Sequence, residues 1–81
     1  MRVWILRIED ADMFGVDEYS VFTTFEKAEA AAWNFVVKDM RLCPEGDFKD
    51  VCCDEYKEGE HFYCREVFEC YPTEFCTELI N

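Results

Sequence analysis

One amphipathic segment near the middle of the chain constrains the fold more than any other feature. It opens with Thr23-Thr24-Phe25-Glu26, which fits a capping box: the Thr23 hydroxyl accepts from the backbone amide of Glu26, and the Glu26 carboxylate reaches back to the amide of Thr23. An alanine-rich run follows and predicts a helix from Thr24 to about Met40. Its apolar stripe, spaced by three and four residues, consists of Phe25, Ala28, Ala32, Phe35 and Val36.

Two large apolar side chains of this helix, Trp33 and Val37, lie outside that stripe. Either the helix is covered on a second side, or the two residues form a contact patch for another protein. Core packing is the favoured interpretation, because small domains often bury wide helical faces.

The helix needs a sheet to cover its stripe, and the N-terminal third of the chain predicts part of one. Residues 2–8 are β-branched and aromatic with apolar side chains on both faces, which suits an interior strand, and residues 18–22 predict a second strand. The polar loop 10–15 joins the two strands as a hairpin. The apolar side chains of the first strand are Trp4, Leu6 and Ile8 on one face and Val3 and Ile5 on the other.

The C-terminal half predicts two more strands, over residues 48–56 and 61–71, joined by a turn at 57–60. The second has clear alternation, whereas acidic residues lower the strand propensity of the first, which could instead be an irregular acidic loop. Pro72 interrupts the chain, and residues 74–80 form a short terminal helix or an edge strand. The expected structure is a single α+β domain over residues 1–81, a small antiparallel sheet in the order ββαββ with one main helix packed on a face.

The charge of the chain points toward its partners. The chain has nineteen Asp and Glu and eight Lys and Arg, which gives a net charge of −11. Because 51% of the residues are hydrophobic, the chain can form a core, and we expect the acids to lie on a folded surface. A negative charge of this size, which works against folding by self-repulsion, serves either to bind a cationic partner or to keep the protein soluble. The candidate partner-binding residues are Asp10, Asp12, Asp17 and Glu18 in the hairpin, and Glu45, Asp47, Asp50, Asp54, Glu55, Glu58 and Glu60 in a later stretch.

Six cysteines, all in the second half of the chain, raise the question of zinc. No secretory signal precedes them, so we expect a soluble, cytoplasmic protein whose thiols are reduced. The nearest ligand set is Cys52, Cys53, His61 and Cys64, but adjacent cysteines point to opposite faces of a strand. We expect no metal and no other cofactor, and a small zinc-binding domain stays as an alternative.

Other classes of function have less support in the sequence. A catalytic motif is lacking, and carboxylates around a Cys–His pair would raise the thiol pKa, so we expect no enzyme. Direct DNA or RNA binding needs a basic surface, and no stretch has the length of a membrane span. A homodimer is compatible with a chain this short.

A resemblance adds to this interpretation. The joint between the second strand and the helix reads VFTTFEKAEA over residues 21–30 and resembles the same joint in many small proteins of bacteria, phages and mobile elements. In size, acidity and lack of catalytic residues, the chain also resembles phage-encoded inhibitors of host defence, including anti-CRISPR and anti-restriction DNA mimics. That resemblance implies a non-enzymatic protein in the host cytoplasm that occupies the nucleic-acid site of a cationic protein complex. The alternative is an intracellular interaction module whose acids serve only solubility.

Overall fold

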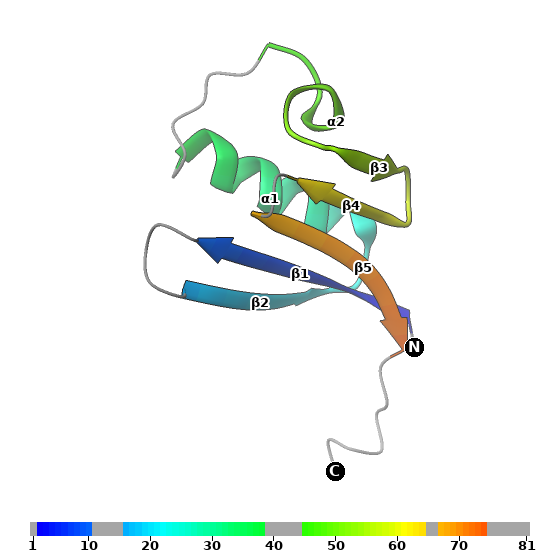
Figure 1. Cartoon of the computed structure of the whole chain (residues 1–81). Coiled ribbons are helices and arrows are strands. Elements are labelled where there is room, and N and C mark those ends of the chain that lie inside the picture. Colours follow the sequence, from blue (N-terminus) through cyan, green and yellow to red (C-terminus); the bar gives the residue numbers. More distant parts are fainter. Residues whose placement is uncertain (1, 11–15, 39–44, 65–66, 75–81) are drawn as a thin grey trace.

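The computed structural model describes residues 2–10, 16–38, 45–64 and 67–74 and has the predicted α+β fold. An antiparallel sheet carries the main helix on one face (Figure 1), with its five strands in the order β2-β1-β5-β4-β3. The elements in chain order are β1 (Arg2–Asp10), β2 (Val16–Phe22), α1 (Phe25–Lys38), α2 (Phe48–Val51), β3 (Glu55–Lys57), β4 (His61–Cys64) and β5 (Phe68–Glu74).

The predicted N-terminal hairpin is confirmed, and its first strand lies inside the sheet. β1 pairs with β2 from Trp4 opposite Phe22 to Asp10 opposite Val16, and its other edge pairs with β5. Because side chains alternate along a strand, this register places Leu6 on the helix side and its odd-numbered neighbours on the far face of the sheet.

The main helix begins one residue later than the capping box predicts. α1 starts at Phe25, and the Thr24 hydroxyl, not that of Thr23, accepts from a backbone amide, that of Lys27 at 3.3 Å. Thr24 is therefore the N-cap, and the expected return contact from Glu26 gives way to a 3.4 Å hydrogen bond from Lys27 Nζ to the Thr23 hydroxyl. The sequence offers two adjacent threonines, and only the path of the chain out of β2 selects between them.

The predicted strand over 48–56 is wrong in most of its length. Residues Phe48–Val51 form the single turn α2, and only the end of the stretch, together with Lys57, enters the sheet as β3. The acidic residues explain this, because they disfavour a strand while the amides of Asp50 and Val51 donate to the Asp47 carbonyl at 3.0 and 3.1 Å.

The single strand predicted over 61–71 is two strands, β4 and β5, which pair with each other. Cys64 lies opposite Phe68, so the chain reverses between them. β5 then continues through Pro72 to Glu74, so the predicted interruption at Pro72 is wrong. Proline has no backbone N–H to donate to a neighbouring strand. Because β4 pairs with β5 only as far as Cys70, Pro72 costs no hydrogen bond between these two strands.

The core lies between α1 and the sheet. Four of the five predicted stripe residues are buried, and the fifth, Phe35, packs edge-to-face on Phe68 with ring centres 5.5 Å apart. Phe48 of α2 enters the same layer and packs against Phe62, with ring centres 4.9 Å apart. The buried members are Leu6, Phe25, Ala28, Ala32, Val36, Phe48, Cys52, Phe62, Cys64, Phe68 and Cys70.

Parts of the sequence predictions fall on segments that are not described. The loop expected over 10–15 and the terminal element expected over 74–80 lie outside the described residues except for Asp10 and Glu74. Among the helices that are described, none has the length and apolarity needed to cross a membrane.

Candidate acidic interaction surface

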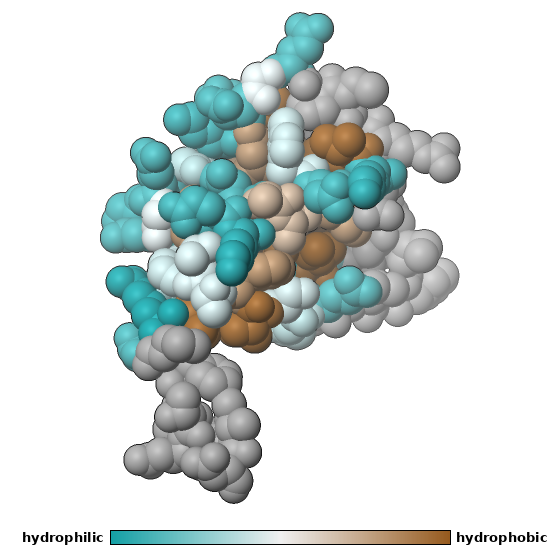
Figure 2. All heavy atoms as spheres, turned by 180° about the vertical axis from the view of Figure 1, so that it is seen from behind, coloured by the Kyte–Doolittle hydropathy of each residue, from teal (hydrophilic) through white to brown (hydrophobic). Residues whose placement is uncertain are grey.

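The stretch of residues 45–60, here called the acidic segment, forms one border of the molecule. It contains α2, the edge strand β3 and the turn that leads into β4 (Figure 1). Hydrophilic residues gather on the side that carries these elements (Figure 2). All seven of its acidic residues are exposed: Glu45, Asp47, Asp50, Asp54, Glu55, Glu58 and Glu60.

In addition to the pairing of β3 with β4, side-chain contacts hold the acidic segment against the rest of the protein. Phe48 inserts into the core, the indole Nε1 of Trp4 donates to the Glu60 carbonyl at 3.2 Å, and the Tyr56 hydroxyl donates to the Glu29 carboxylate. The turn itself closes through the amide of Glu60, which donates to the Lys57 carbonyl at 2.9 Å. The carboxylates therefore have a fixed backbone beneath them.

Two lysines lie within the acidic segment and neutralise little of it. Lys57 Nζ is 3.3 Å from the Glu60 carboxylate, but both side chains are exposed, so this ion pair is weak. Lys49 Nζ lies 5.9 Å from the centre of the Tyr56 ring. The segment thus keeps a clear excess of negative charge.

Of the hairpin acids predicted as part of the site, Glu18 lies at the border of the sheet opposite the acidic segment. Glu18 is exposed on β2, the edge strand farthest from β3 in the sheet order. Asp10 and Asp17 occupy paired positions of β1 and β2, opposite Val16 and Glu9 respectively, and Asp12 lies outside the described residues. Among the described side chains, Glu18 is therefore separated from the acidic segment by the width of the sheet.

A depression between α1 and the acidic segment brings Glu29, which the sequence assigns to no site, beside residues that the sequence does single out. Its volume is about 440 Å³, and Glu29 and Trp33 reach it from the helix. Trp33 is half-buried and meets Phe48 edge-to-face, with ring centres 5.6 Å apart, so its predicted packing role holds for one side of the ring. The full lining is Glu29, Ala30, Trp33, Gly46, Asp47, Phe48, Lys49, Tyr56 and Glu58.

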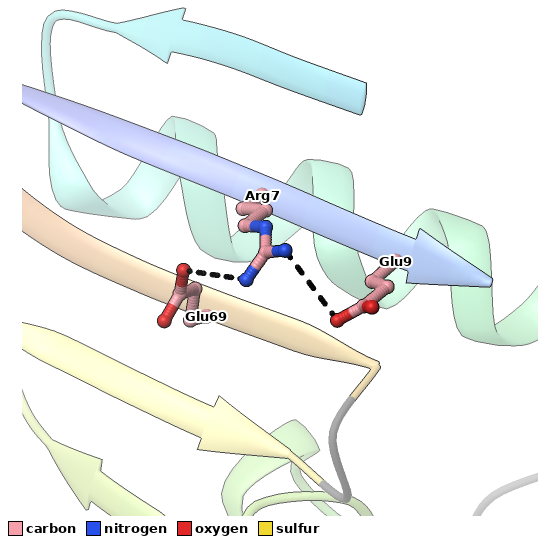
Figure 3. A network of polar contacts seen from close by, with 3 residues as sticks. All are labelled: Arg7, Glu9 and Glu69. Atoms are coloured by element: carbon pink, nitrogen blue, oxygen red, sulfur yellow. Dashed lines mark hydrogen bonds and ion pairs between the residues drawn. The ribbon is translucent and has the colours of Figure 1, made fainter. Parts of the chain in front are cut away.

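The far face of the sheet has a different character. Arg7 lies there between two carboxylates, 3.5 Å from Glu9 on its own strand and 3.4 Å from Glu69 on β5 (Figure 3). A smaller depression of about 160 Å³ adjoins this group. The exposed apolar side chains of the described residues are Tyr19, Val21 and Tyr71 on this face, at 59%, 55% and 39% exposure, and Val37 on the helix, at 44%.

The four described cysteines lie in the core or beside it. Cys52, Cys64 and Cys70 are buried, Cys53 is half-buried, and none of the four is in a disulfide, while Cys43 and Cys76 lie outside the described residues. Burial, and for Cys53 also the neighbouring thiols, raises the pKa of Cys53 and of Cys70 to about 12.

The proposed zinc ligands are split by the strand that carries two of them. Cys64 is on the helix side of β4 and its thiol donates to the Cys52 carbonyl, whereas His61, three residues earlier, is on the far face. Within the described ranges no three His, Cys, Asp or Glu side chains are placed to hold a metal ion.

Neither a protein-family model nor a curated protein or solved structure matches this chain.

Proposed function

We propose that this protein is a non-enzymatic inhibitor or modulator of a nucleic-acid-binding protein complex, of the anti-CRISPR or anti-restriction type. In this proposal the acidic segment occupies a cationic site that otherwise holds phosphates. The observation that carries it is the exposure of seven carboxylates along one border of the fold, on a backbone held by Phe48, Trp4 and Tyr56.

The physical basis is the match between a row of carboxylates and a row of basic side chains. Proteins that bind DNA neutralise its closely spaced phosphates with Arg and Lys. Carboxylates accept bidentate hydrogen bonds from Arg in a similar way, and opposite charges accelerate encounter. We assign the site to the acidic segment because its seven exposed carboxylates follow one border of the fold, whereas the exposed Glu18 lies on β2 at the other border.

Competition with DNA tests this proposal directly. A tagged form of the protein is used to isolate partners, and each purified partner is then bound in the presence of duplex DNA and of increasing NaCl. Binding should weaken steeply with salt, and DNA should displace the protein. A partner that stays bound unchanged with excess DNA and at high salt contradicts mimicry.

Matched charge reversals locate the surface. Asp47→Lys, Asp50→Lys and Asp54→Lys, made together, should lower affinity mainly through a slower association rate. The control reverses three exposed acids outside the segment, Glu18→Lys, Glu26→Lys and Glu74→Lys, with the same change in net charge. Equal losses for the two triple variants would mean that total charge, not the acidic segment, governs binding.

A second candidate function is an interaction module that binds through the far face of the sheet. The exposed side chains of Tyr19, Val21 and Tyr71 favour it, because aromatic residues are enriched in protein interfaces. Binding would then tolerate salt, depend on Tyr19 and Tyr71, and be indifferent to reversal of Asp47, Asp50 and Asp54.

A further inference from the structure

We propose that the depression between α1 and the acidic segment binds an arginine side chain of the partner. This inference rests on the proposed function in one respect, the cationic nature of the partner. It adds a single anchoring point, with α1 as one wall and the acidic segment as the other.

The walls of the depression supply aromatic rings. Trp33 contributes one from the helix, held by its edge-to-face contact with Phe48, and Tyr56 contributes another from β3, held by a similar contact with Phe25 at 5.8 Å. A planar guanidinium stacks on such rings and keeps its N–H groups available for hydrogen bonds at its edge. The volume of about 440 Å³ lies in the range of about 300–1,000 Å³ typical of ligand pockets.

The rim supplies carboxylates around those rings. Glu29, Asp47 and Glu58 line the depression from three separate stretches of chain. Glu29 is oriented by the hydroxyl of Tyr56, and burial together with this hydrogen bond raises the pKa of Tyr56, so the phenol stays a donor at neutral pH. Carboxylates arranged in this way can accept paired hydrogen bonds from the N–H groups of an arginine guanidinium.

The chain's own Lys49 indicates what the depression attracts. Its ammonium group lies over the Tyr56 ring, 5.9 Å from the ring centre, beside the acidic rim. Lysine is a compact, strongly hydrated charge, whereas arginine stacks and forms paired hydrogen bonds. A partner arginine can therefore take the place of Lys49, whose side chain is exposed and able to move aside.

The test uses short peptides in place of the unidentified partner. Three five-residue glycine-serine peptides carry arginine, lysine or the neutral isostere citrulline at the centre, and each is titrated into the ¹⁵N-labelled protein. The arginine peptide should shift the Trp33 indole N–H and the amides of Tyr56 and Glu58 saturably. The lysine peptide should bind at least threefold more weakly, and the citrulline peptide should cause no such shifts.

Paired variants separate a local site from general charge attraction. The double variant Asp47→Asn with Glu58→Gln should lower the affinity for the arginine peptide at least fivefold. The double variant Glu18→Gln with Glu26→Gln, which has the same net charge, should change this affinity less than twofold. Trp33→Leu, with its fold checked by circular dichroism, should also weaken binding at least fivefold. Equal effects of the two double variants, shifts confined to other residues, or equal shifts with citrulline would overturn the site.

The two proposals fail in different ways. If DNA displaces the protein from a partner but the arginine peptide does not bind in the depression, the anchoring site is wrong and the proposed function stands. If the peptide occupies the depression but isolated partners are insensitive to DNA and salt, the site stands and the proposed function is wrong.

Discussion

At the scale of single residues, the buried thiols are neutral groups that the fold keeps protonated. Burial raises the pKa of Cys53 and of Cys70 from 9.0 to about 12. The thiolate is the reactive form of cysteine, so at neutral pH these two side chains behave as small apolar groups. Their chemical role in this fold is packing.

This protonation predicts a loss of stability in alkaline solution. Between pH 9 and about 12 the unfolded chain has released the protons of Cys53 and Cys70 while the folded chain still holds them. The free energy of unfolding should therefore be unaffected by these thiols below pH 9 and should fall as pH rises above it. Urea unfolding at pH 7, 9 and 10.5 under reducing conditions measures this. Cys70→Ala should flatten the decline, and an unchanged slope in that variant would contradict the assignment.

The N-cap gives a second prediction for single residues. Thr24→Ala removes the hydroxyl that accepts from the Lys27 amide and should lower the free energy of unfolding by about 1 kcal/mol. Thr23→Ala removes only an exposed hydrogen bond from the Lys27 side chain and serves as the control. Urea denaturation of both variants is the measurement, and a larger loss for Thr23→Ala would restore the capping box expected from sequence.

At the scale of elements, α2 is too short to form on its own, and Phe48 holds it in place. The Phe48 ring meets Trp33 of α1, Phe62 of β4 and Phe68 of β5. An isolated helical turn is unstable in water, so α2 depends on this tertiary packing. The position of the acidic segment depends in turn on one buried ring.

Truncation of this anchor tests its importance. Phe48→Ala should cost about 3–5 kcal/mol, comparable with the total stability of a small domain, and leave much of the protein unfolded. Phe48→Leu should retain the fold with a smaller loss. Thermal denaturation followed by circular dichroism compares the two, and a melting temperature for Phe48→Ala within about 2 °C of the parent would show that α2 is not held in this way.

The elements also show how far the sequence predicts the fold. The hairpin, the helix and the turn at Gly59, whose φ of 78° suits glycine, follow from local patterns. The reversal between Cys64 and Phe68 does not, because both residues are buried on the helix side and the alternation of apolar residues continues through the turn without a change of phase. Periodicity therefore cannot distinguish this hairpin from one long strand.

The same limit applies to the candidate site. The acidic segment could be named from sequence because its carboxylates are contiguous. Glu29 could not, and Trp33 could be named only as one of two alternatives, because the depression that they line exists only after α1 and α2 pack together. The separation of Glu18 from the acidic segment likewise depends on the strand order, with β2 and β3 at opposite borders.

At the scale of the whole molecule, the net charge of −11 works against the compact state. Repulsion between distant carboxylates is screened over about 30 Å at 0.01 M salt and about 10 Å at 0.1 M. The melting temperature should therefore rise as NaCl is increased from 0.01 to 0.3 M. Scanning calorimetry measures this rise. The double variant Asp50→Asn with Glu55→Gln should show a weaker dependence of the melting temperature on NaCl. A melting temperature that falls with salt would mean that ion pairs such as Arg7 with Glu69 outweigh the repulsion.

The strand order has a further consequence for how copies of the protein behave in a crowded solution. Among the described residues, β2 and β3 each have one edge that pairs with no other strand, and an open sheet edge invites aggregation. β2 carries Glu18 and β3 carries Glu55, each exposed. Near the isoelectric point of about 4.3 the net charge of the protein approaches zero and repulsion between copies weakens, so edge-to-edge pairing of copies should set the lower pH limit of the monodisperse protein.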